Sequence, residues 1–228
     1  MRIAEIYKSI QGEGFLTGIP SVFIRVSGCN LRCCYCDTPY TSWEPEGDDL
    51  SLDEISQLAL AYDCKHVVLT GGEPMLFSEV LPLCAALRDG GSHITVETAG
   101  TLYLPLHCDL MSISPKLTNS TPTNERAGRW HERHERTRHA PDVIRRLIQE
   151  VDYQFKFVVQ DLADCDEVEV YLQQLPEIDR SRVMLMPEGT DSAHLAATAE
   201  WLKPLCARRQ LAYCARRHIE LFGLSRGT

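Results

Sequence analysis

The sequence predicts an α/β protein, a partial (β/α)6 TIM-like barrel with parallel strands inside and helices outside. Two observations support this. Short β-branched segments alternate with segments that have apolar residues at helical spacing, and polar or glycine-rich residues follow directly after the strands. That edge of a parallel sheet is where barrel and open α/β proteins place their chemistry. Six strands rather than eight predict a barrel with an open side.

The elements follow one another in a regular order. The first strand (SVFIRVS) runs into a cysteine loop, and the next helix starts at Ser51, where Glu54 completes a capping box. Later strands end in TGGEP, ET, SPK and MPEG. The predicted strands are 21–27, 66–69, 93–96, 110–113, 153–159 and 182–185, and the predicted helices are 51–62, 78–88, 141–151, 162–175 and 191–206. With no internal repeat and no linker, we expect a single domain over residues 1–228.

Composition excludes several classes of protein. No window approaches the roughly 18 unbroken apolar residues that a membrane span needs, and no secretory signal follows Met1, so we expect a cytoplasmic protein. The net charge of −9 argues against a general nucleic-acid-binding surface. Ten cysteines in a reducing compartment favour metal or redox chemistry over disulfides. The six that are scattered singly are interpreted as small buried hydrophobic residues.

The stretch 124–139 (NERAGRWHERHERTRH) differs from the rest of the chain. It is nearly free of aliphatic residues and mixes arginine, glutamate and histidine, so we interpret it as a polar insertion that forms a solvated loop or an exposed helix. A metal site from His131 and His134 is the weaker alternative, because no cysteine or oxygen ligand is fixed nearby by the sequence.

The strongest motif is Cys29-x3-Cys33-x2-Cys36. Three thiolates in a tight loop can ligate three irons of a [4Fe–4S] cube and leave the fourth iron for an external ligand. In this spacing the open iron suits the amino and carboxylate groups of S-adenosylmethionine (SAM). A zinc loop is the alternative, but zinc usually takes four ligands and no second cysteine pair exists here. Cys34 adjoins Cys33 and is expected to point away.

A glycine-rich turn, Gly71-Gly72-Glu73-Pro74, follows the second predicted strand. Two glycines allow the backbone to approach a ligand closely, and a carboxylate there can bind the ammonium group of methionine. Alone this turn would be ordinary. After a CxxxCxxC loop it indicates a SAM site.

Together these residues resemble the radical SAM superfamily and, within it, the 7-carboxy-7-deazaguanine synthase family. The resemblance runs from Ile10-Gln11-Gly12-Glu13-Gly14 to Arg217-His218, and the QGEG opening, the Cys36-Asp37-Thr38 triplet and the late His218 narrow it to that family. It implies a single radical SAM core domain with an N-terminal substrate-binding segment. The implied reaction converts 6-carboxy-5,6,7,8-tetrahydropterin to 7-carboxy-7-deazaguanine, with loss of ammonia, in queuosine and 7-deazapurine biosynthesis.

The resemblance also implies roles for particular residues. Expected SAM-binding residues are Tyr35, Cys36, Asp37, Gly72, Glu73, Ser114, Pro115 and Lys116, with Thr98 and residues 186–189 as weaker candidates. Expected substrate-binding residues are Ile10, Gln11, Gly12, Arg25, Thr70 and His218. Thr38 matches a Mg²⁺ ligand. No catalytic residue is expected beyond these ligands.

Physical chemistry supports some of these roles. Arg25 lies within an apolar strand, where an arginine needs a reason, and its planar fork can bind the substrate carboxylate. Mg²⁺ prefers oxygen ligands and keeps several waters, so one threonine hydroxyl is a reasonable protein ligand. Glu13 could equally be a solvated loop residue, Lys116 a surface residue and His218 a packed core histidine.

Two rival functions share part of this pattern. A radical SAM activase that installs a glycyl radical on a partner protein would carry the same CxxxCxxC and GGEP motifs, but it needs no small anion pocket such as Arg25 and Thr38 suggest. A binding module stabilised by zinc or a cluster is the non-enzymatic alternative. The expected partners are a small pterin substrate, an electron donor such as flavodoxin or ferredoxin and a second copy of the chain in a homodimer, with no nucleic acid and no membrane.

Overall fold

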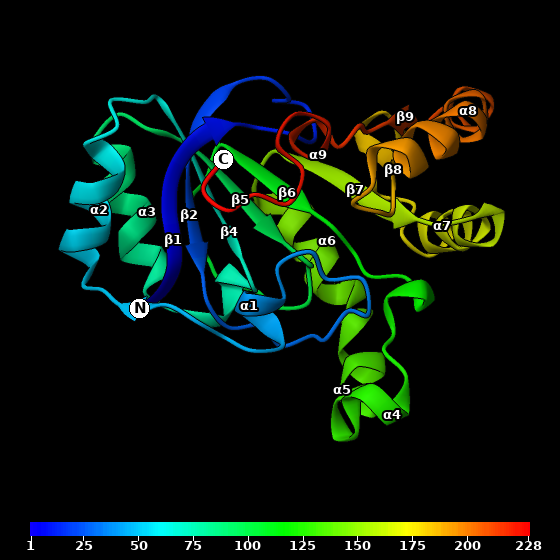
Figure 1. Ribbon diagram of the computed structural model, residues 1–228, viewed down its shortest axis with the longest axis horizontal. Helices are drawn as coiled ribbons and strands as arrows, with labels where there is room; N and C mark the ends of the chain where they lie inside the picture. The colour runs from blue at the N-terminus through cyan, green and yellow to red at the C-terminus, as the bar shows by residue number, and fades with distance from the viewer.

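A computed structural model describes all residues, 1–228, and its centre is one twisted nine-stranded sheet (Figure 1). The strand order is β3-β1-β2-β4-β5-β6-β7-β8-β9. The strands are β1 (Arg2–Ile10), β2 (Pro20–Val26), β3 (Asp48–Asp49), β4 (His66–Gly71), β5 (His93–Thr98), β6 (Leu110–Ile113), β7 (Tyr153–Val159), β8 (Val183–Pro187) and β9 (Ala212–Tyr213). All neighbours from β2 to β9 are parallel, so the predicted parallel partial barrel is confirmed, with the two-residue β9 added to the six predicted strands.

Helices connect the parallel strands, except between β5 and β6, and pack on the outside of the curved sheet (Figure 1). The α-helices are α1 (Pro39–Ser42), α2 (Leu52–Leu60), α3 (Val80–Asp89), α4 (Asn124–Ala127), α5 (Arg129–Arg138), α6 (Pro141–Glu150), α7 (Leu162–Gln174), α8 (Ser192–Arg209) and α9 (Arg217–Phe222). Short 3₁₀ turns are η1 (Pro74–Leu76), η2 (Thr118–Ser120) and η3 (Arg180–Arg182). The capping box predicted at Ser51 is present. No helix combines the length and apolar character needed to cross a bilayer.

The sequence did not reveal the strands at the edges of the sheet. β1 pairs antiparallel with β2, and β3 pairs antiparallel with β1, so the amino-terminal edge of the sheet is mixed rather than parallel. Most side chains of β1 are half-buried on both faces, which removes the strict polar–apolar alternation by which a strand is recognised. β3 and β9 have two residues each, too short for any pattern.

Side chains of β7 point alternately to the two faces of the sheet, one of which packs against the helices while the other faces a cavity. Phe155 and Phe157 are completely buried in the hydrophobic core, where Phe157 packs edge-on against Tyr171 of α7. Lys156 and Val158 point the opposite way and line a cavity inside the curve of the sheet. One strand therefore supplies both the packed outer core and the polar lumen.

The polar stretch 124–139 is helical, as α4 and α5, and most of its side chains are exposed. Exposure is not uniform, however, because His134 is fully buried. Its Nδ1 accepts a hydrogen bond of 3.1 Å from the backbone N–H of Arg32, and its Nε2 lies 2.9 Å from Ser120 Oγ. Burial lowers the pKa of His134 to about 4, so the ring is neutral and acts as a structural bridge. No third His, Cys, Asp or Glu side chain is placed so that it could hold a metal ion together with His131 and His134.

Candidate functional site

The lumen of the partial barrel holds one cavity of about 300 Å³, within the range of small-molecule sites. Neighbouring strands present inward side chains in register: Arg25 of β2 lies beside Thr70 of β4, and Glu97 of β5 lies beside Ser112 of β6. All four line the cavity together with Lys156 of β7. The polar residues that follow individual strands in the sequence are thereby brought to one place.

The cysteine loop closes one side of this cavity, and Cys29, Cys33 and Cys36 all line it. Hydrogen bonds fix the loop to its surroundings: the Gly28 N–H donates to the Thr41 carbonyl at 2.8 Å, and the Trp43 indole N–H donates to the Cys33 carbonyl at 3.0 Å. Cys34 faces the other way, where its thiol donates to the Asn119 carbonyl at 3.1 Å. Three of the four clustered thiols are therefore available to one ligand.

The chemistry of these thiols suits an iron–sulfur cube rather than a single ion. Burial raises the pKa of Cys29 to about 12 and that of Cys33 further still, so both are neutral thiols unless cations stabilise the thiolates. Only three thiols line the cavity, one fewer than the four ligands that a structural zinc site usually takes. A cube takes one thiolate on each of three irons, which matches this number.

The glycine turn after β4 packs directly against the cysteine loop. The Gly72 N–H donates to the Val26 carbonyl at 3.0 Å, and the Glu73 N–H donates to the Gly28 carbonyl at 2.8 Å. A Cβ at Gly72 would lie 2.0 Å from the Gly28 carbonyl oxygen. Gly72 lines the cavity, so this position needs glycine both for the contact between the two loops and for close approach to a ligand.

Replacing Gly72 by alanine should therefore displace the cysteine loop. We expect a loss of about 1–3 kcal/mol in unfolding free energy and a reduced iron content after anaerobic reconstitution, because the clash is with backbone. Thermal unfolding and iron analysis measure the two effects. Gly90→Ala is the matched control, since its Cβ would meet the flexible end of the Leu60 side chain at 2.9 Å and no backbone atom closer than the Leu87 carbonyl oxygen at 3.3 Å. Equal behaviour of the two variants would contradict the proposed contact.

Glu73 has a different surrounding from the one expected for a SAM ligand. Its side chain is completely buried and does not line the cavity. The carboxylate accepts hydrogen bonds from Thr98 Oγ1 at 2.8 Å, the Ala99 N–H at 2.9 Å and the Met75 N–H at 3.1 Å. In this structure the carboxylate ties the glycine turn to the end of β5, and a contact between Glu73 and SAM stays a prediction.

The other expected SAM positions divide in a similar way. Tyr35, Cys36, Asp37, Ser114 and Lys116 line the cavity, as do the weaker candidates Thr98, Met186 and Glu188, whereas Pro115 does not. The Lys116 ammonium donates to the Ser114 carbonyl and hydroxyl, both at 2.8 Å. This bond holds the two residues as one polar corner beside the cysteines.

The amino-terminal segment lines the opposite side of the cavity through Ile10, Gln11 and Gly12. Little of its backbone is free: the Gln11 N–H and carbonyl are used in the turn before β2, and the Gly12 carbonyl accepts from the Arg217 N–H at 2.9 Å. The buried Gln11 side chain donates to Ser21 Oγ at 2.9 Å, which leaves its carbonyl oxygen as an acceptor. Recognition by Gln11 would therefore use the side chain more than the backbone.

Arg25 is almost buried and already holds two partners. Its Nε donates to Glu5 at 3.0 Å and its Nη2 to the Tyr7 hydroxyl at 2.9 Å, while Nη1 makes no hydrogen bond within the protein. Burial opposes the charge, but Tyr7, Tyr40 and Glu5 keep the pKa of Arg25 above its ordinary value. The guanidinium is thus a fixed cation with one nitrogen left for an anion in the cavity.

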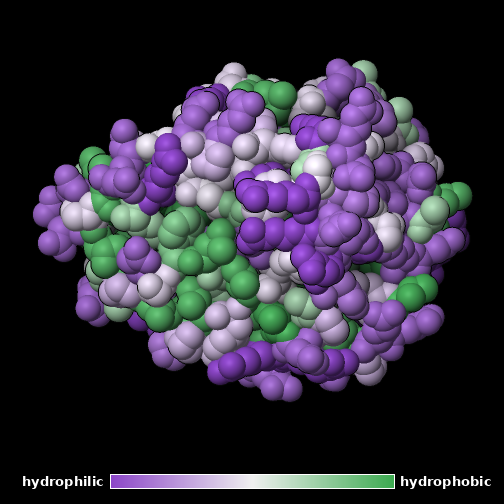
Figure 2. All heavy atoms as spheres, turned by 90° about the horizontal axis from the view of Figure 1, so that it is seen from below, coloured by the Kyte–Doolittle hydropathy of each residue, from purple (hydrophilic) through white to green (hydrophobic).

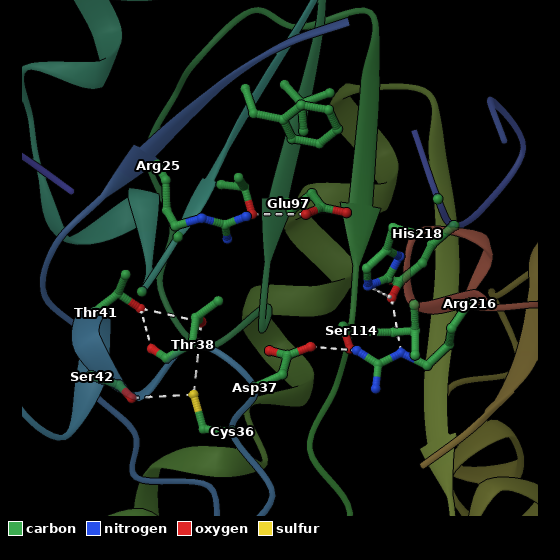
Figure 3. Close-up of a pocket in the computed structure, with 18 of the residues that line it drawn as sticks. Arg25, Cys36, Asp37, Thr38, Thr41, Ser42, Glu97, Ser114, Arg216 and His218 are labelled. Atoms are coloured by element: carbon green, nitrogen blue, oxygen red, sulfur yellow. Dashed lines mark hydrogen bonds and ion pairs between the residues drawn. The ribbon is translucent and has the colours of Figure 1, made fainter. Parts of the chain in front are cut away.

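Figure 3 shows the region where Cys36, Asp37 and Thr38 face the cavity. The Cys36 thiol lies 3.2 Å from Ser42 Oγ and 3.8 Å from Thr38 Oγ1. Thr38 Oγ1 also accepts from the Thr41 hydroxyl at 3.3 Å. The hydroxyl expected to bind Mg²⁺ is therefore close to the third cysteine of the motif.

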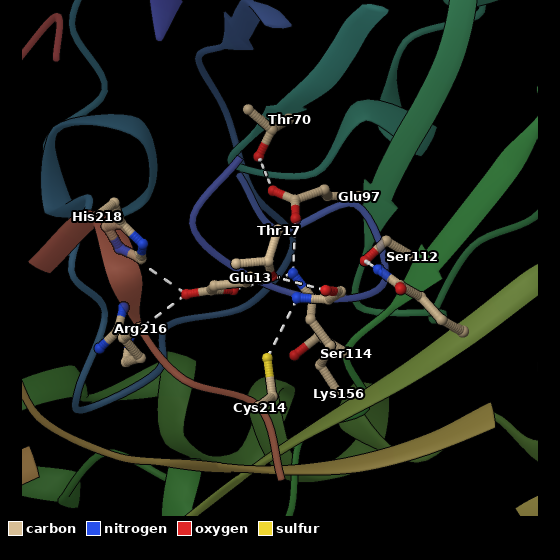
Figure 4. Close-up of polar contacts among 12 residues, drawn as sticks. Glu13, Thr17, Thr70, Glu97, Ser112, Ser114, Lys156, Cys214, Arg216 and His218 are labelled. Carbon is tan, nitrogen blue, oxygen red and sulfur yellow. Dashed lines mark hydrogen bonds and ion pairs between the residues drawn. The ribbon is translucent and has the colours of Figure 1, made fainter. Parts of the chain in front are cut away.

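An ionic network centred on Lys156 crosses the cavity (Figure 4), and no sequence pattern predicted it. Its ammonium, only 4% exposed, lies 2.9 Å from Glu13 and 2.6 Å from Glu97, and Glu97 also accepts from the Thr70 hydroxyl at 2.7 Å. Burial opposes the positive charge of Lys156 and the negative charge of Glu13. The nearby carboxylates of Glu97 and Glu13 nevertheless raise the pKa of Lys156, and the nearby cations Lys156 and Arg216 lower the pKa of Glu13. Glu13 is therefore a half-buried carboxylate held by two cations and not a solvated loop residue.

The carboxyl-terminal tail completes the network. Arg216, 7% exposed, donates to Glu13 at 3.3 Å, to the Gly189 carbonyl at 2.7 Å and to Asp37 beside the cysteines. His218 Nε2 lies 3.8 Å from Glu13, and a Cβ at Gly12 would lie 2.2 Å from its Nδ1. The two ends of the chain are thus joined around Glu13, and residues 223–228 also line the cavity.

Comparison with known proteins agrees with this geometry. Residues 23–154 match the family model of the radical SAM superfamily. The chain is 45% identical over 227 residues to the 7-carboxy-7-deazaguanine synthase of Rhodopirellula baltica, covering 99% of this chain and 88% of that one. It is 42% identical over 230 residues to the enzyme of the same name from Halobacterium salinarum, covering 96% and 90%.

Among solved structures, the crystal structure of QueE from Escherichia coli is similar over 95% of this chain and 94% of that one. Its TM-score is 0.69 at 23% identity, which is a likeness of fold. The relatives named above share more than two-fifths of their residues with the chain over nearly its whole length. On this evidence the chain belongs to the 7-carboxy-7-deazaguanine synthase family of the radical SAM superfamily.

Proposed function

We propose that the protein converts 6-carboxy-5,6,7,8-tetrahydropterin to 7-carboxy-7-deazaguanine with loss of ammonia, in the biosynthesis of queuosine and related 7-deazapurines. The observation that supports this most is the single cavity described above. The three cysteines of the motif line one side of it, and Gln11, Gly12 and Glu13 line the other together with Arg25 and Thr70. A radical formed at the cysteine side would act on a molecule held in the same enclosed space.

When bound at Cys29, Cys33 and Cys36, a [4Fe–4S] cluster with SAM would supply the 5′-deoxyadenosyl radical that starts such a reaction. Tyr35, Gly72, Ser114 and Lys116 are proposed to surround SAM beside it. For Glu73 we propose a supporting role in the glycine turn, in keeping with its three hydrogen bonds to Thr98, Ala99 and Met75.

The remaining residues are proposed to hold the pterin. The free Nη1 of Arg25 is a donor for the substrate carboxylate, and the side-chain carbonyl of Gln11 is an acceptor for the N–H groups of the pterin edge. Thr70 and His218 line the same space. Glu13, Glu97 and Lys156 carry fixed charges within it, so the substrate would meet a preorganised polar wall.

Arg25 offers a direct test of substrate binding. In Arg25→Gln we expect the KM for the pterin to rise by about 100-fold or more, with a smaller change in kcat, because a buried charge–charge contact is lost. Arg25→Lys should recover only part of the effect, since a point charge cannot hold Glu5, Tyr7 and a carboxylate together. Steady-state kinetics measures both. A lower melting temperature with an unchanged KM would mean that Arg25 has only a structural role.

Magnesium, localisation and assembly belong to the same proposal. Thr38 is the proposed Mg²⁺ ligand, supported by its position 3.8 Å from the Cys36 thiol and by the preference of Mg²⁺ for oxygen. An ion there could orient the substrate carboxylate next to the radical source. A homodimer and flavodoxin or ferredoxin as reductant remain predictions from the family resemblance, and a cytoplasmic location remains a prediction from the sequence composition.

The proposal is tested by turnover. The anaerobically reconstituted protein should form 7-carboxy-7-deazaguanine from the pterin, detected by mass, when given SAM, Mg²⁺ and dithionite. The glycyl-radical activase alternative is not favoured, because the named relatives are deazaguanine synthases. SAM cleavage without any deazaguanine product would contradict the proposed substrate, and a colourless, iron-free protein would contradict the radical chemistry altogether.

A further inference from the structure

One part of the molecule has no role in the proposed reaction. We call residues 124–138, which form α4 and α5, the basic arm. None of its residues lines the cavity. Figure 1 shows the basic arm projecting from the body of the protein, below the end of the sheet that carries the cysteine loop. An exposed extension placed beside a redox centre suggests contact with a partner.

Three contacts fix the basic arm to the outer side of the cysteine loop. Arg126 donates to the Cys34 carbonyl at 2.9 Å, His134 accepts from the Arg32 N–H at 3.1 Å, and Trp130 stacks on the Arg32 guanidinium at 3.8 Å. Arg32 in turn donates to the carbonyl of Cys29 at 2.8 Å. Hydrogen bonds and one cation–π contact therefore link the basic arm to the loop that carries the three cysteines.

Two half-buried tryptophans lie between the surface and the cysteines. The Trp43 indole N–H donates to the Cys33 carbonyl at 3.0 Å, and the Arg126 guanidinium covers its ring at 4.2 Å. The Trp130 ring has the exposed Arg133 at 4.4 Å in addition to Arg32. Trp43 is thus hydrogen-bonded directly to the backbone of Cys33, and Trp130 is linked to the backbone of Cys29 through Arg32 alone.

The charge of the basic arm opposes that of the whole protein. It contains five arginines and three glutamates, a net charge of +2, on a chain of net charge −9. Arg126, Arg129, Arg133 and Arg136 are exposed, and Arg129 and Arg136 have no carboxylate partner. Figure 2 shows the molecule from the side toward which the basic arm projects, and strongly hydrophilic residues there lie beside an apolar area. Such a surface attracts an acidic protein and repels a basic one.

We propose that the basic arm, together with Trp43, is the docking surface for an acidic protein that carries single electrons at low potential, such as a flavodoxin. This rests on the proposed function, because docking matters only if a cluster needs an electron. A cluster held by Cys29, Cys33 and Cys36 would take one electron from the reduced carrier, which would be oxidised by one electron. That electron would serve the reductive cleavage of the C–S bond of SAM into methionine and a 5′-deoxyadenosyl radical.

The test uses Arg129→Glu/Arg133→Glu in the reconstituted full-length protein, with a purified flavodoxin as the probe. Arg88→Glu/Arg208→Glu is the matched control, since it changes the net charge equally at two exposed positions on α3 and α8, away from the basic arm. Binding of oxidised flavodoxin is measured by titration at several salt concentrations. SAM cleavage is measured separately with reduced flavodoxin and with dithionite.

We expect the double variant to bind flavodoxin at least about tenfold more weakly than the wild type and the control. Wild-type binding should weaken with added salt. Dithionite-driven cleavage should stay within about twofold in all three proteins, because a small reductant needs no docking surface. The KM for flavodoxin should rise in the double variant while kcat changes less.

Unchanged flavodoxin binding in the double variant would overturn the proposal. A parallel fall of the dithionite and flavodoxin rates would also overturn it, since the basic arm would then be only a brace for the cysteine loop. Binding of an RNA duplex that the double variant loses, with no binding of flavodoxin, would assign the surface to a different partner. If the wild type fails with dithionite, the proposed function fails instead, while the binding titration still reports on docking.

Discussion

Replacement of Cys33 by alanine should abolish SAM cleavage, by about 10³-fold or more, and reduce the iron content of the reconstituted protein. Cys33 is buried on the cavity wall, and a cube that loses one of only three thiolates has two irons without protein ligands. Iron and sulfide analysis, the visible spectrum and the rate of 5′-deoxyadenosine formation measure the effect.

The neighbouring residue provides the control. Cys34 does not line the cavity, and its thiol is bonded to the Asn119 carbonyl. Cys34→Ala should therefore keep its iron, its colour and most of its activity, although the side chains removed are identical. Loss of the cluster in Cys34→Ala, or its retention in Cys33→Ala, would show that the three cavity cysteines are not the ligands.

Lys156→Met should have the largest effect on stability. The variant leaves Glu13 and Glu97 facing each other in the barrel without their shared cation, and breaking a buried ion pair in this way costs about 3–5 kcal/mol. Urea unfolding measures the loss. Arg180→Met removes a half-exposed pair with Glu169 and should cost at most about 1 kcal/mol. Equal costs would contradict the central position of Lys156.

The pH dependence of stability should change in the same variant. In the wild type the pKa of Glu13 is below its ordinary 4.5, so its contribution is complete above pH 4.5 and is lost as the pH falls below that value. The pKa of Lys156 is above its ordinary 10.5, so its contribution is complete below pH 10.5 and is lost only as the pH rises further. Lys156→Met should flatten both ends of this profile. Restoration of stability by adding Glu13→Gln would confirm that the two groups are coupled.

The sequence predicted the six parallel strands because short apolar or β-branched segments alternate with helical segments along most of the chain, with polar or glycine-rich residues after the strands. It also predicted which residues could form the cysteine loop and glycine turn, since both motifs are contiguous. β1 was missed because its half-buried side chains break the alternating pattern. The burial of the Glu73 carboxylate was not predicted, because it depends on three hydrogen-bond donors, two of them at the end of β5, which no local sequence pattern indicates.

Lys156 shows most clearly what a linear pattern lacks. In YQFKFVV it occupies the position that would face water in a two-layer protein, and only closure of the barrel turns that face into a lumen. Arg216 was missed for a related reason, since its partners Glu13 and Asp37 are 203 and 179 residues away. Ion pairs of such separation depend on the full path of the chain.

The central claim is that a radical formed at the cysteine loop acts on a pterin held by the opposite wall of the same cavity. A substrate that carries deuterium at C6 tests this directly. In the reaction that the family resemblance implies, the deoxyadenosyl radical takes a hydrogen from C6 of the pterin, and SAM is regenerated afterwards. The account therefore predicts that mass spectrometry will find deuterium in the SAM recovered after turnover, because the hydrogen taken from C6 mixes with the two hydrogens already on the 5′ carbon before SAM forms again. Deazaguanine product with no deuterium in either SAM or 5′-deoxyadenosine would contradict it.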